Sequence, residues 1–327
     1  MFFGNSGWCD KIQVMSSEVI DMRRERLSWI GAIGAGAGLV VASLYMPGGD
    51  DLYRYYLPFA QGCLDCGFIP YFAQWFLAPL RYFPDYPSTW FLWTFVSVVG
   101  FITLAHSTGS NPLFLLISFP MLGQVWLGQV DILVAVGLVV FLSGKNLHWR
   151  GVGMILALSK PQLTVSPILV CLFLDSPRDL LKMLAVPVGA IFISLYAFGW
   201  DWWLQWFDNA VNGLPIHVWR LASLDVWKFG IILAPFPFLF QNQRKRLTAG
   251  LLVAALGTPF FGVYSYVLFL LFEVRWWSAL LSYLWLGAFI FWQESAMRLA
   301  WILPLGLLLN LAYLEFAHRH EAESKRP

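Results

Sequence analysis

Long apolar runs without charged residues are the feature that most limits how this chain can fold. The first runs from Trp29 to Pro47, and as a helix rising about 1.5 Å per residue it would cross roughly 30 Å of hydrocarbon. Hydrophobic residues make up 59% of the chain and charged residues 12%, and the mean hydropathy is +0.65. These properties are typical of an all-α polytopic membrane protein.

Eleven further apolar runs follow the first one. They cover residues 89–106, 112–127, 130–143, 151–159, 161–174, 180–199, 224–240, 248–257, 259–272, 276–292 and 298–316. Four of these runs are too short for a simple crossing, and they form two pairs that are each broken at a proline, Pro161 and Pro259. We therefore expect a bundle of about 10–12 hydrophobic helices, some short or broken, in one membrane domain over residues 29–316.

Each broken pair is either one kinked span or a shallow hairpin, and the basic residues distinguish the two. With two hairpins, 15 of the 21 basic residues lie on the cytoplasmic side: Lys11, Arg23, Arg24, Arg26, Lys145, Arg150, Arg178, Lys182, Arg244, Lys245, Arg246, Arg275, Arg319, Lys325 and Arg326. If the first pair is one kinked span, the bias largely disappears. We therefore predict hairpins and a multi-pass protein of the cell membrane with both termini cytoplasmic.

This topology divides the rest of the chain into tails and loops. Residues 1–28 have no apolar core or cleavage site of a secretory signal, so they are predicted to be a cytoplasmic tail that precedes an uncleaved span. A second cytoplasmic tail covers residues 317–327. The outer face carries a first loop at residues 48–88 and a second large loop at residues 200–223.

Aromatic residues crowd both outer loops. Residues 52–62 and 70–83 mix them with a few polar groups, which predicts helices lying in the membrane interface. The segment from Trp200 to Asp208 is rich in tryptophan, and such residues either anchor a protein at the headgroups or form a wall for a sugar or lipid chain. The outer position of Cys63-Leu64-Asp65-Cys66 would allow a local disulfide.

Asp50 and Asp51 lie side by side just after the first span, where the chain leaves the bilayer. Adjacent carboxylates repel each other, so one of them should hold its proton more tightly than a free aspartate does. This makes the pair the best candidate for a catalytic acid or base. The alternative is the solvated start of a loop.

Asp131 and Lys160 are ionisable residues at or near membrane depth. Asp131 follows Gly128-Gln129-Val130 between two apolar runs, and Lys160 lies at the tip of the first predicted hairpin. Such residues usually face a polar cavity, where a cation can receive a phosphate and a carboxylate can orient a hydroxyl. Alternatively, Lys160 extends to the surface or pairs with Asp131.

The order of these features resembles the polyprenol-phosphate-sugar-dependent glycosyltransferases of the GT-C superfamily, in particular glycosyltransferase family 87, with its mannosyltransferases and arabinofuranosyltransferases. The resemblance covers about residues 29–272. Four segments carry it. Asp51-Leu52-Tyr53-Arg54-Tyr55 is similar to the family's Asp-Leu-x-x-Tyr, and Ile69-Pro70-Tyr71 with Ala78-Pro79-Leu80 and Phe83-Pro84 is similar to its Tyr-Pro-Pro, Ala-Pro-Leu and a following proline. Gly128-Gln129-Val130-Asp131 is similar to its Gly-Gln-x-Asn, and Ala157-Leu158-Ser159-Lys160 is similar to the start of its Ala-x-x-Lys-x-x-Pro. The chain departs from the family where Asp131 replaces Asn, Pro161 directly follows the lysine, and Tyr71 stands without the double proline.

The resemblance implies a GT-C-like fold and an inverting transfer of mannose or a pentose from a polyprenyl-phosphate donor to a lipid or glycan acceptor on the outer face. Its general base would be Asp51, with Asp50 as the alternate. Lys160 and Arg54 are the candidates for binding the donor phosphate. Gln129, Asp131, Tyr55 and Tyr71 are the candidates for contacting substrate.

Other ligands and other function classes are less consistent with the sequence. It has no glycine-rich nucleotide loop, and its net charge of +2 gives no indication of nucleic acid. Asp50, Asp51 and Asp131 could hold a divalent metal if they converge, but the resemblance points to transfer without a metal or other cofactor. A transporter or lipid flippase would also use broken helices and buried charges but predicts internal repeats, and a non-catalytic membrane subunit is a third reading.

Overall fold

The protein is all-α in the computed structural model, which describes residues 6–83, 86–173, 175–212, 227–258 and 261–324. Every regular element in these ranges is a helix. The four longest are α1 (Ser6–Tyr45), α4 (Ser88–Thr108), α10 (Pro177–Phe198) and α18 (Ile302–Ser324). The predicted fold class, an all-α polytopic membrane protein with some short or broken helices, is confirmed.

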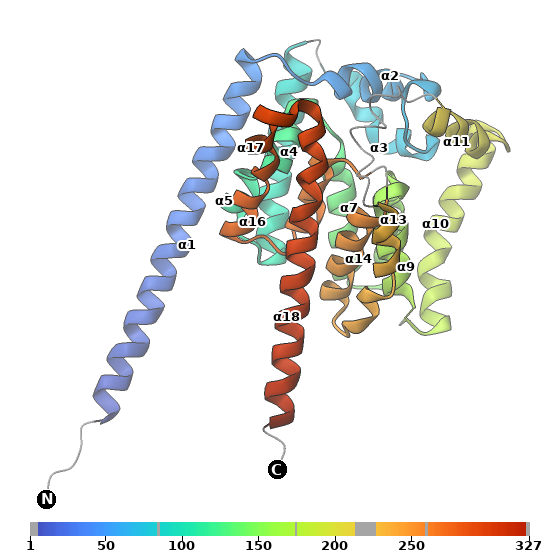
Figure 1. Ribbon diagram of the computed structural model, residues 1–327. Helices are drawn as coiled ribbons and strands as arrows, with labels where there is room; N and C mark the ends of the chain where they lie inside the picture. Colours follow the sequence, from blue (N-terminus) through green and yellow to red (C-terminus); the bar gives the residue numbers. More distant parts are fainter. Residues whose placement is uncertain (1–5, 84–85, 174, 213–226, 259–260, 325–327) are drawn as a thin grey trace, which may run out of the picture.

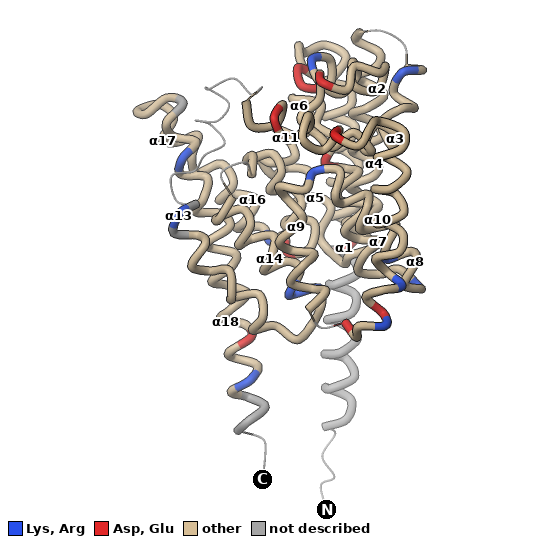
Figure 2. Tube along the Cα trace, turned by 90° about the vertical axis from the view of Figure 1, so that its right-hand side faces the viewer, with Lys and Arg blue, Asp and Glu red and all other residues tan. Residues whose placement is uncertain are grey.

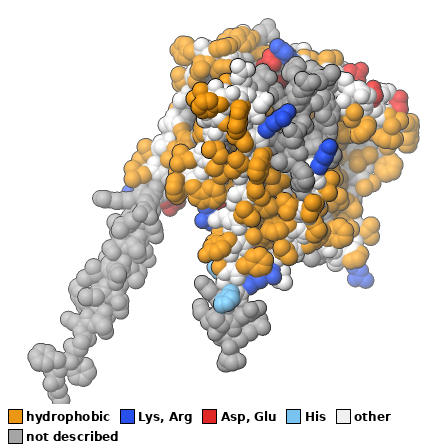
Figure 3. Space-filling model, viewed as in Figure 1, with side chains coloured by type: hydrophobic (Ala, Val, Ile, Leu, Met, Phe, Trp, Pro, Cys, Tyr) orange, Lys and Arg blue, Asp and Glu red, His pale blue; other side chains and the backbone are white. Residues whose placement is uncertain are grey.

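Four segments are long and apolar enough to cross a membrane, judged by length and composition. They are Glu25–Tyr45, Ser88–Thr108, Pro177–Phe198 and Ser295–His320. Shorter apolar segments lie at Asp131–Ser143, Pro161–Leu172 and Trp276–Trp292. Apolar side chains cover much of the visible face of the bundle (Figure 3), as expected for a surface that faces lipid.

Both ends of the described chain lie at the same end of the bundle (Figure 1). Helix α1 begins at Ser6 and runs without interruption into the first apolar run, so the predicted N-terminal tail is largely helical. We refer to the end where α1 begins and α18 finishes as the terminal end. The side of the membrane that it faces stays a prediction.

Short helices cover the opposite end, which we call the loop end (Figure 1). They are η1 (Leu52–Tyr56), α2 (Leu57–Ala60), η2 (Leu64–Cys66), η3 (Tyr71–Ala73), α3 (Gln74–Leu77), η4 (Ala78–Tyr82) and α11 (Trp202–Asn212). Several acidic positions lie at this end of the bundle (Figure 2). The predicted helices at residues 52–62 and 70–83 are therefore present, whereas residues 213–223 of the second predicted outer loop lie outside the described residues.

The remaining helices fill the bundle between the two ends. They are α5 (Pro112–Leu116), α6 (Phe119–Leu127), α7 (Asp131–Ser143), α8 (Leu147–Ala157), α9 (Pro161–Leu172), α13 (Trp227–Gly230), η5 (Ile231–Leu233), η6 (Phe236–Leu239), α14 (Gln243–Gly257), η7 (Val263–Tyr266), α15 (Val267–Leu270), α16 (Trp276–Leu281), α17 (Leu284–Trp292) and η8 (Gln293–Trp301). The apolar run predicted at residues 224–240 is divided into three short helices over its described part. Pro235 and Pro237 lie in that run and have no backbone N–H to continue a helix.

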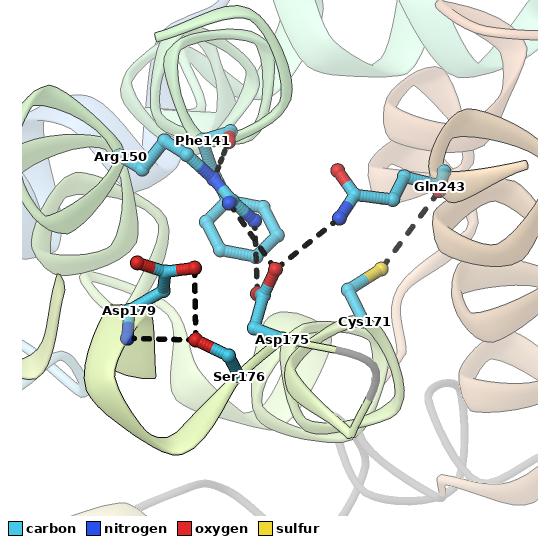
Figure 4. A network of polar contacts seen from close by, with 7 residues as sticks. All are labelled: Phe141, Arg150, Cys171, Asp175, Ser176, Asp179 and Gln243. Atoms are coloured by element: carbon cyan, nitrogen blue, oxygen red, sulfur yellow. Dashed lines mark hydrogen bonds and ion pairs between the residues drawn. The ribbon is translucent and has the colours of Figure 1, made fainter. Parts of the chain in front are cut away.

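Both proline-broken pairs form hairpins. Arg150 in the first turn of α8 pairs with Asp175, just after α9, at 3.1 Å (Figure 4). Arg244 at the start of α14 donates to the backbone oxygen of Phe272, just after α15, at 2.7 Å. Because the start and the end of each pair meet in this way, α8 with α9 and α14 with α15 each turn back at the break rather than continuing as one kinked span.

Polar caps start several helices at the terminal end. Side-chain oxygens of Asn111, Asn146, Ser176 and Asn242 accept hydrogen bonds from backbone N–H groups in the first turns of α5, α8, α10 and α14. These contacts satisfy groups that a helix start would otherwise leave unpaired. The two hairpins therefore begin from defined positions, and α8 and α14 run from there toward the loop end.

Candidate active site

Two glycine turns bring the loop that begins at residue 48 against the turn between α6 and α7. The backbone N–H of Gly49 donates to the carbonyl of Trp126 at 2.7 Å. Gly128 ends α6 with φ +69°, and a Cβ added there would lie 2.7 Å from the Cβ of Leu52. Glycine is required at this approach because a side chain would collide with the loop that carries Asp51.

Asp51 lies at the start of η1, which is a π-helix, a local form that is frequent at functional sites. Its side chain is half-buried, and Gln129 donates a hydrogen bond from Nε2 to Asp51 Oδ2. Burial raises the pKa of Asp51 to about 6, and the charge of Asp50 adds to this while Lys160 and Arg54 oppose it. A carboxyl with such a pKa can act as a base near neutral pH.

Gln129 connects Asp51 to the interior of the bundle. It is 1% exposed, and its Oε1 accepts hydrogen bonds from the hydroxyl of Tyr56 at 2.8 Å and from the ammonium of Lys160 at 2.6 Å. Its backbone carbonyl accepts from Trp93 Nε1 at 3.0 Å and from Gln124 Nε2 at 2.9 Å. The residue is therefore held through both its side chain and its main chain.

Both hairpins contact Asp131. Lys160, at the first tip, places Nζ 2.5 Å from Asp131 Oδ1, and Ser265 of the second hairpin donates to Asp131 Oδ2 at 2.6 Å. Both members of the ion pair are almost fully buried. The lysine ammonium also lies 5.5 Å from the ring centroids of Tyr56 and Tyr264, where their π faces attract a cation. The pairing alternative for Lys160 is thus the arrangement in this structure.

Asp50 and Asp51 differ in their surroundings even though they are adjacent. Asp50 is exposed and pairs with Arg54 at 2.7 Å, and the Arg54 side chain is 67% exposed. Tyr55 is half-buried four residues after Asp51 and packs edge-on against Phe68 at 5.0 Å between ring centroids. The structure therefore has one carboxylate turned into the bundle and another at its surface.

Tyr71 makes its described contacts in another part of the loop end. Its ring stacks on Trp202 of α11 at 5.7 Å between centroids, and its hydroxyl donates to Asp65 at 2.5 Å. A disulfide joins Cys63 and Cys66 on either side of that aspartate, as the sequence allowed. No described contact links Tyr71 to Asp51 or Gln129, so its predicted substrate contact stays a prediction.

Three further residues belong to this cluster by contact: Tyr56, Tyr264 and Ser265. No sequence pattern had indicated these three residues. Tyr56 is one residue from a predicted site tyrosine, and the other two follow the second proline break. The second proline break could have indicated them, because the first proline break had already indicated Lys160.

The predicted carboxylates do not gather around a common point. Asp131 pairs with Lys160, and Asp50 pairs with Arg54. Within the part of the chain that the structure describes, no three His, Cys, Asp or Glu side chains form a group that could hold a metal ion. The possible convergence of Asp50, Asp51 and Asp131 on a metal is therefore not found among these residues.

Comparison with known proteins identifies the family. The sequence model of glycosyltransferase family 87 matches residues 69–234, which is half of the chain. The chain belongs to glycosyltransferase family 87. No curated protein and no solved structure matches it.

Family membership and the helical fold together establish the general activity. The family match includes Gln129, Asp131 and Lys160, whereas Asp51 lies outside it and joins the site through the contact with Gln129. The all-α fold is consistent with the GT-C superfamily. The protein is therefore a membrane glycosyltransferase, and this finding favours an enzyme over the transporter, flippase or non-catalytic subunit considered from the sequence.

Proposed function

We propose that this family 87 protein transfers mannose or a pentose from a polyprenyl-phosphate donor to a lipid or glycan acceptor, with inversion at the anomeric carbon. Asp51 is the general base. The observation that carries this proposal is the contrast between the two adjacent aspartates: Asp51 is half-buried and held by Gln129, while Asp50 is exposed and paired with Arg54. Burial gives Asp51 the pKa of about 6 that suits a base near neutral pH.

The chemical step needs one proton acceptor and one departing phosphate. Asp51 takes the proton of an acceptor hydroxyl as its oxygen attacks the anomeric carbon. The bond from that carbon to the phosphate oxygen breaks, and polyprenyl phosphate departs with the electron pair. Attack from the face opposite the phosphate inverts the configuration.

A cation should stabilise the phosphate as its charge develops. Of the two cations predicted for this role, Arg54 is the accessible one, with a side chain that is 67% exposed, whereas Lys160 is 3% exposed and already paired with Asp131. A guanidinium can also bind two phosphate oxygens at once. We therefore propose that Arg54 moves from Asp50 to the donor phosphate and that Tyr55, one helical turn from the base, contacts the acceptor.

The proposed site faces the outside of the cell membrane, with both termini cytoplasmic. Two observations support this orientation. The predicted cytoplasmic tails and loops carry most of the basic residues. The disulfide between Cys63 and Cys66 lies at the loop end, and disulfides persist mainly in oxidising compartments.

The test is release of polyprenyl phosphate by the purified protein in lipid nanodiscs, supplied with a panel of polyprenyl-phosphate sugars and candidate acceptors. Asp51→Asn and Asp50→Asn are matched variants, because they make the same change at neighbouring positions. We expect Asp51→Asn to lower kcat at least about 100-fold, the order of a lost general base, while Asp50→Asn retains activity. Equal loss in both variants would contradict the assignment of the base to Asp51.

We further propose that the transfer needs no metal. Activity should persist after dialysis against a chelator and should not increase when Mg²⁺, Mn²⁺ or Ca²⁺ is added back. Abolition by the chelator with recovery on one of these ions would overturn the proposal and would place Asp50 or Asp51 among the candidate ligands.

A further inference from the structure

The direction of the Gln129 side-chain amide is determined by its neighbours. An amide oxygen and nitrogen have nearly the same shape, so contacts must show which is which. The ammonium of Lys160 can only donate, and it lies 2.6 Å from Oε1. The hydroxyl of Tyr56 donates to the same oxygen at 2.8 Å. With two donors on the oxygen, the nitrogen must point the other way, toward Asp51.

The carboxylate of Asp51 is a suitable partner for that nitrogen. An ionised carboxylate only accepts hydrogen bonds, and Gln129 Nε2 donates to its Oδ2. Reversing the amide would place its oxygen against the carboxylate and its nitrogen against the ammonium, which leaves two unfavourable contacts in a buried site. Only one amide orientation is compatible with all three neighbours.

From this geometry, we propose that Gln129 is a positioning residue that holds the Asp51 carboxylate, and that Lys160 fixes the direction of its amide while the Tyr56 hydroxyl donates to the same amide oxygen. This inference rests on the proposed role of Asp51 as the base. In this proposal Lys160 has a structural role, because its ammonium contacts both the Asp131 carboxylate and the Gln129 amide oxygen. Donor phosphate is then left to Arg54 at the surface.

The proposal predicts how Asp51 titrates. A hydrogen bond donated to a carboxylate favours its charged form and lowers its pKa, so the Gln129 amide opposes the effect of burial. The charged groups that act on Asp51 are Asp50, Arg54, Lys160 and Asp131, and the neighbouring tyrosines at positions 55, 56 and 264 are neutral near pH 7. Gln129→Met removes the donor at nearly constant size and leaves every one of these groups in place.

The experiment is carbodiimide labelling of the protein in nanodiscs at a series of pH values, because carbodiimides react with protonated carboxyl groups. Fragmentation between residues 50 and 51 in the mass spectrometer separates the two adducts, and Asp50 is the internal reference. We expect wild-type Asp51 labelling to fall as the pH rises through about 6, and the midpoint in Gln129→Met to be higher by about one pH unit.

Gln124→Met is the matched control, since Gln124 is also buried but donates to the backbone carbonyl of Gln129 rather than to Asp51. It should lower the melting temperature without moving the Asp51 midpoint. If Gln129→Met does not fold, Tyr56→Phe removes a single hydroxyl from the same amide and should give a smaller upward shift. An unchanged midpoint in the folded variants, or an equal shift in Gln124→Met, would overturn the proposal.

The transfer assay separates this inference from the proposed function. If both hold, Gln129→Met lowers kcat and raises the pH of half-maximal activity, with little change in KM for the donor. A large rise in KM with an unchanged labelling midpoint would assign Gln129 to substrate binding and overturn the positioning role. If the Asp51 labelling midpoint shifts in Gln129→Met but the wild-type protein transfers no sugar from any donor, the positioning role of Gln129 stands and the proposed reaction is rejected.

Discussion

Lys160 and Asp131 form an ion pair of 2.5 Å in which both side chains are almost fully buried. This pair joins the tip of the first hairpin to the start of α7. Ser265 brings the second hairpin to the same carboxylate. The pair therefore contributes to the shape of the site as well as to its charge.

Removing one member of this pair should destabilise the protein strongly. Lys160→Met leaves the Asp131 carboxylate buried without its cation, and we expect a loss of about 3 kcal/mol in the free energy of unfolding. The double variant Lys160→Met with Asp131→Asn removes both charges and should recover most of the loss, because asparagine can still accept from Ser265. Thermal melting in nanodiscs measures both. Equal destabilisation by the single and the double variant would contradict the argument.

Activity should depend on pH through Asp51. The base works only when it is deprotonated, so kcat/KM should rise with pH through about 6 and level off above it. Asp50→Asn removes a like charge that raises the Asp51 pKa, so the rise should move to lower pH by less than about one unit. A rate that is constant between about pH 5 and 7, or a rise that moves upward in Asp50→Asn, would refute this dependence.

The ionised Asp51 should lower the free energy of unfolding at neutral pH. Its folded-state pKa of about 6 is above the unfolded value of 3.8, so its contribution to stability is present below about pH 4 and is lost as the pH rises through about 6. At pH 7.5, Asp51→Asn should therefore have a free energy of unfolding roughly 1–3 kcal/mol higher than wild type, and a higher melting temperature, while it loses activity. At about pH 4 the two proteins should melt alike. Lower stability of the variant at pH 7.5 would contradict the raised pKa.

The Arg150–Asp175 pair at the terminal end should matter for stability and not for catalysis. Arg150 also donates to the backbone oxygen of Phe141 at 3.1 Å, and Gln243 lies on the other side of Asp175 (Figure 4). We expect Arg150→Met to lower the free energy of unfolding by about 2 kcal/mol, with unchanged turnover per folded molecule. The exposed Arg178→Met is the control and should change stability by less than about 0.5 kcal/mol.

A change in KM for the donor in Arg150→Met would contradict the assignment of this pair to stability. Equal melting temperatures for Arg150→Met and Arg178→Met would show that the ion pair contributes nothing measurable. Arg150 and Arg178 lie in the first turns of α8 and α10 at the terminal end, whereas Asp51 lies at the loop end, so the two readouts are independent of the proposed base.

Much of the fold follows from the sequence because apolar runs and their breaks are local signals. The described helices lie close to the predicted runs, and α9 starts at Pro161 as the break indicated. The hairpins could be predicted because basic residues mark the ends of membrane segments. The division of residues 227–239 into short helices was harder to predict, because prolines interrupt a run whose composition is otherwise that of a span.

Several individual residues of the candidate site could be predicted from the sequence, but the contacts between them could not. Asp51 was indicated by the adjacent carboxylate of Asp50, Gln129 by the family resemblance, and Asp131 and Lys160 by the cost of ionisable groups at membrane depth. Their pairing was not determined by this cost, since Lys160 could have bound a phosphate, extended to the surface or paired with Asp131. Ser265 was missed because a serine in an apolar segment is ordinary until its partner is known.

The sequence by itself determined that the chain is a membrane protein built from helices, where its hairpins break, and which family it resembles. These properties depend on hydrophobicity, proline geometry and short motifs, which act over a few neighbouring residues. Only the tertiary structure decided that Asp51 is turned inward and Asp50 outward, and that one glutamine amide joins Asp51 to a buried lysine. That outcome depends on which groups meet across 78 residues of chain, and the close approach of two glycine turns sets it.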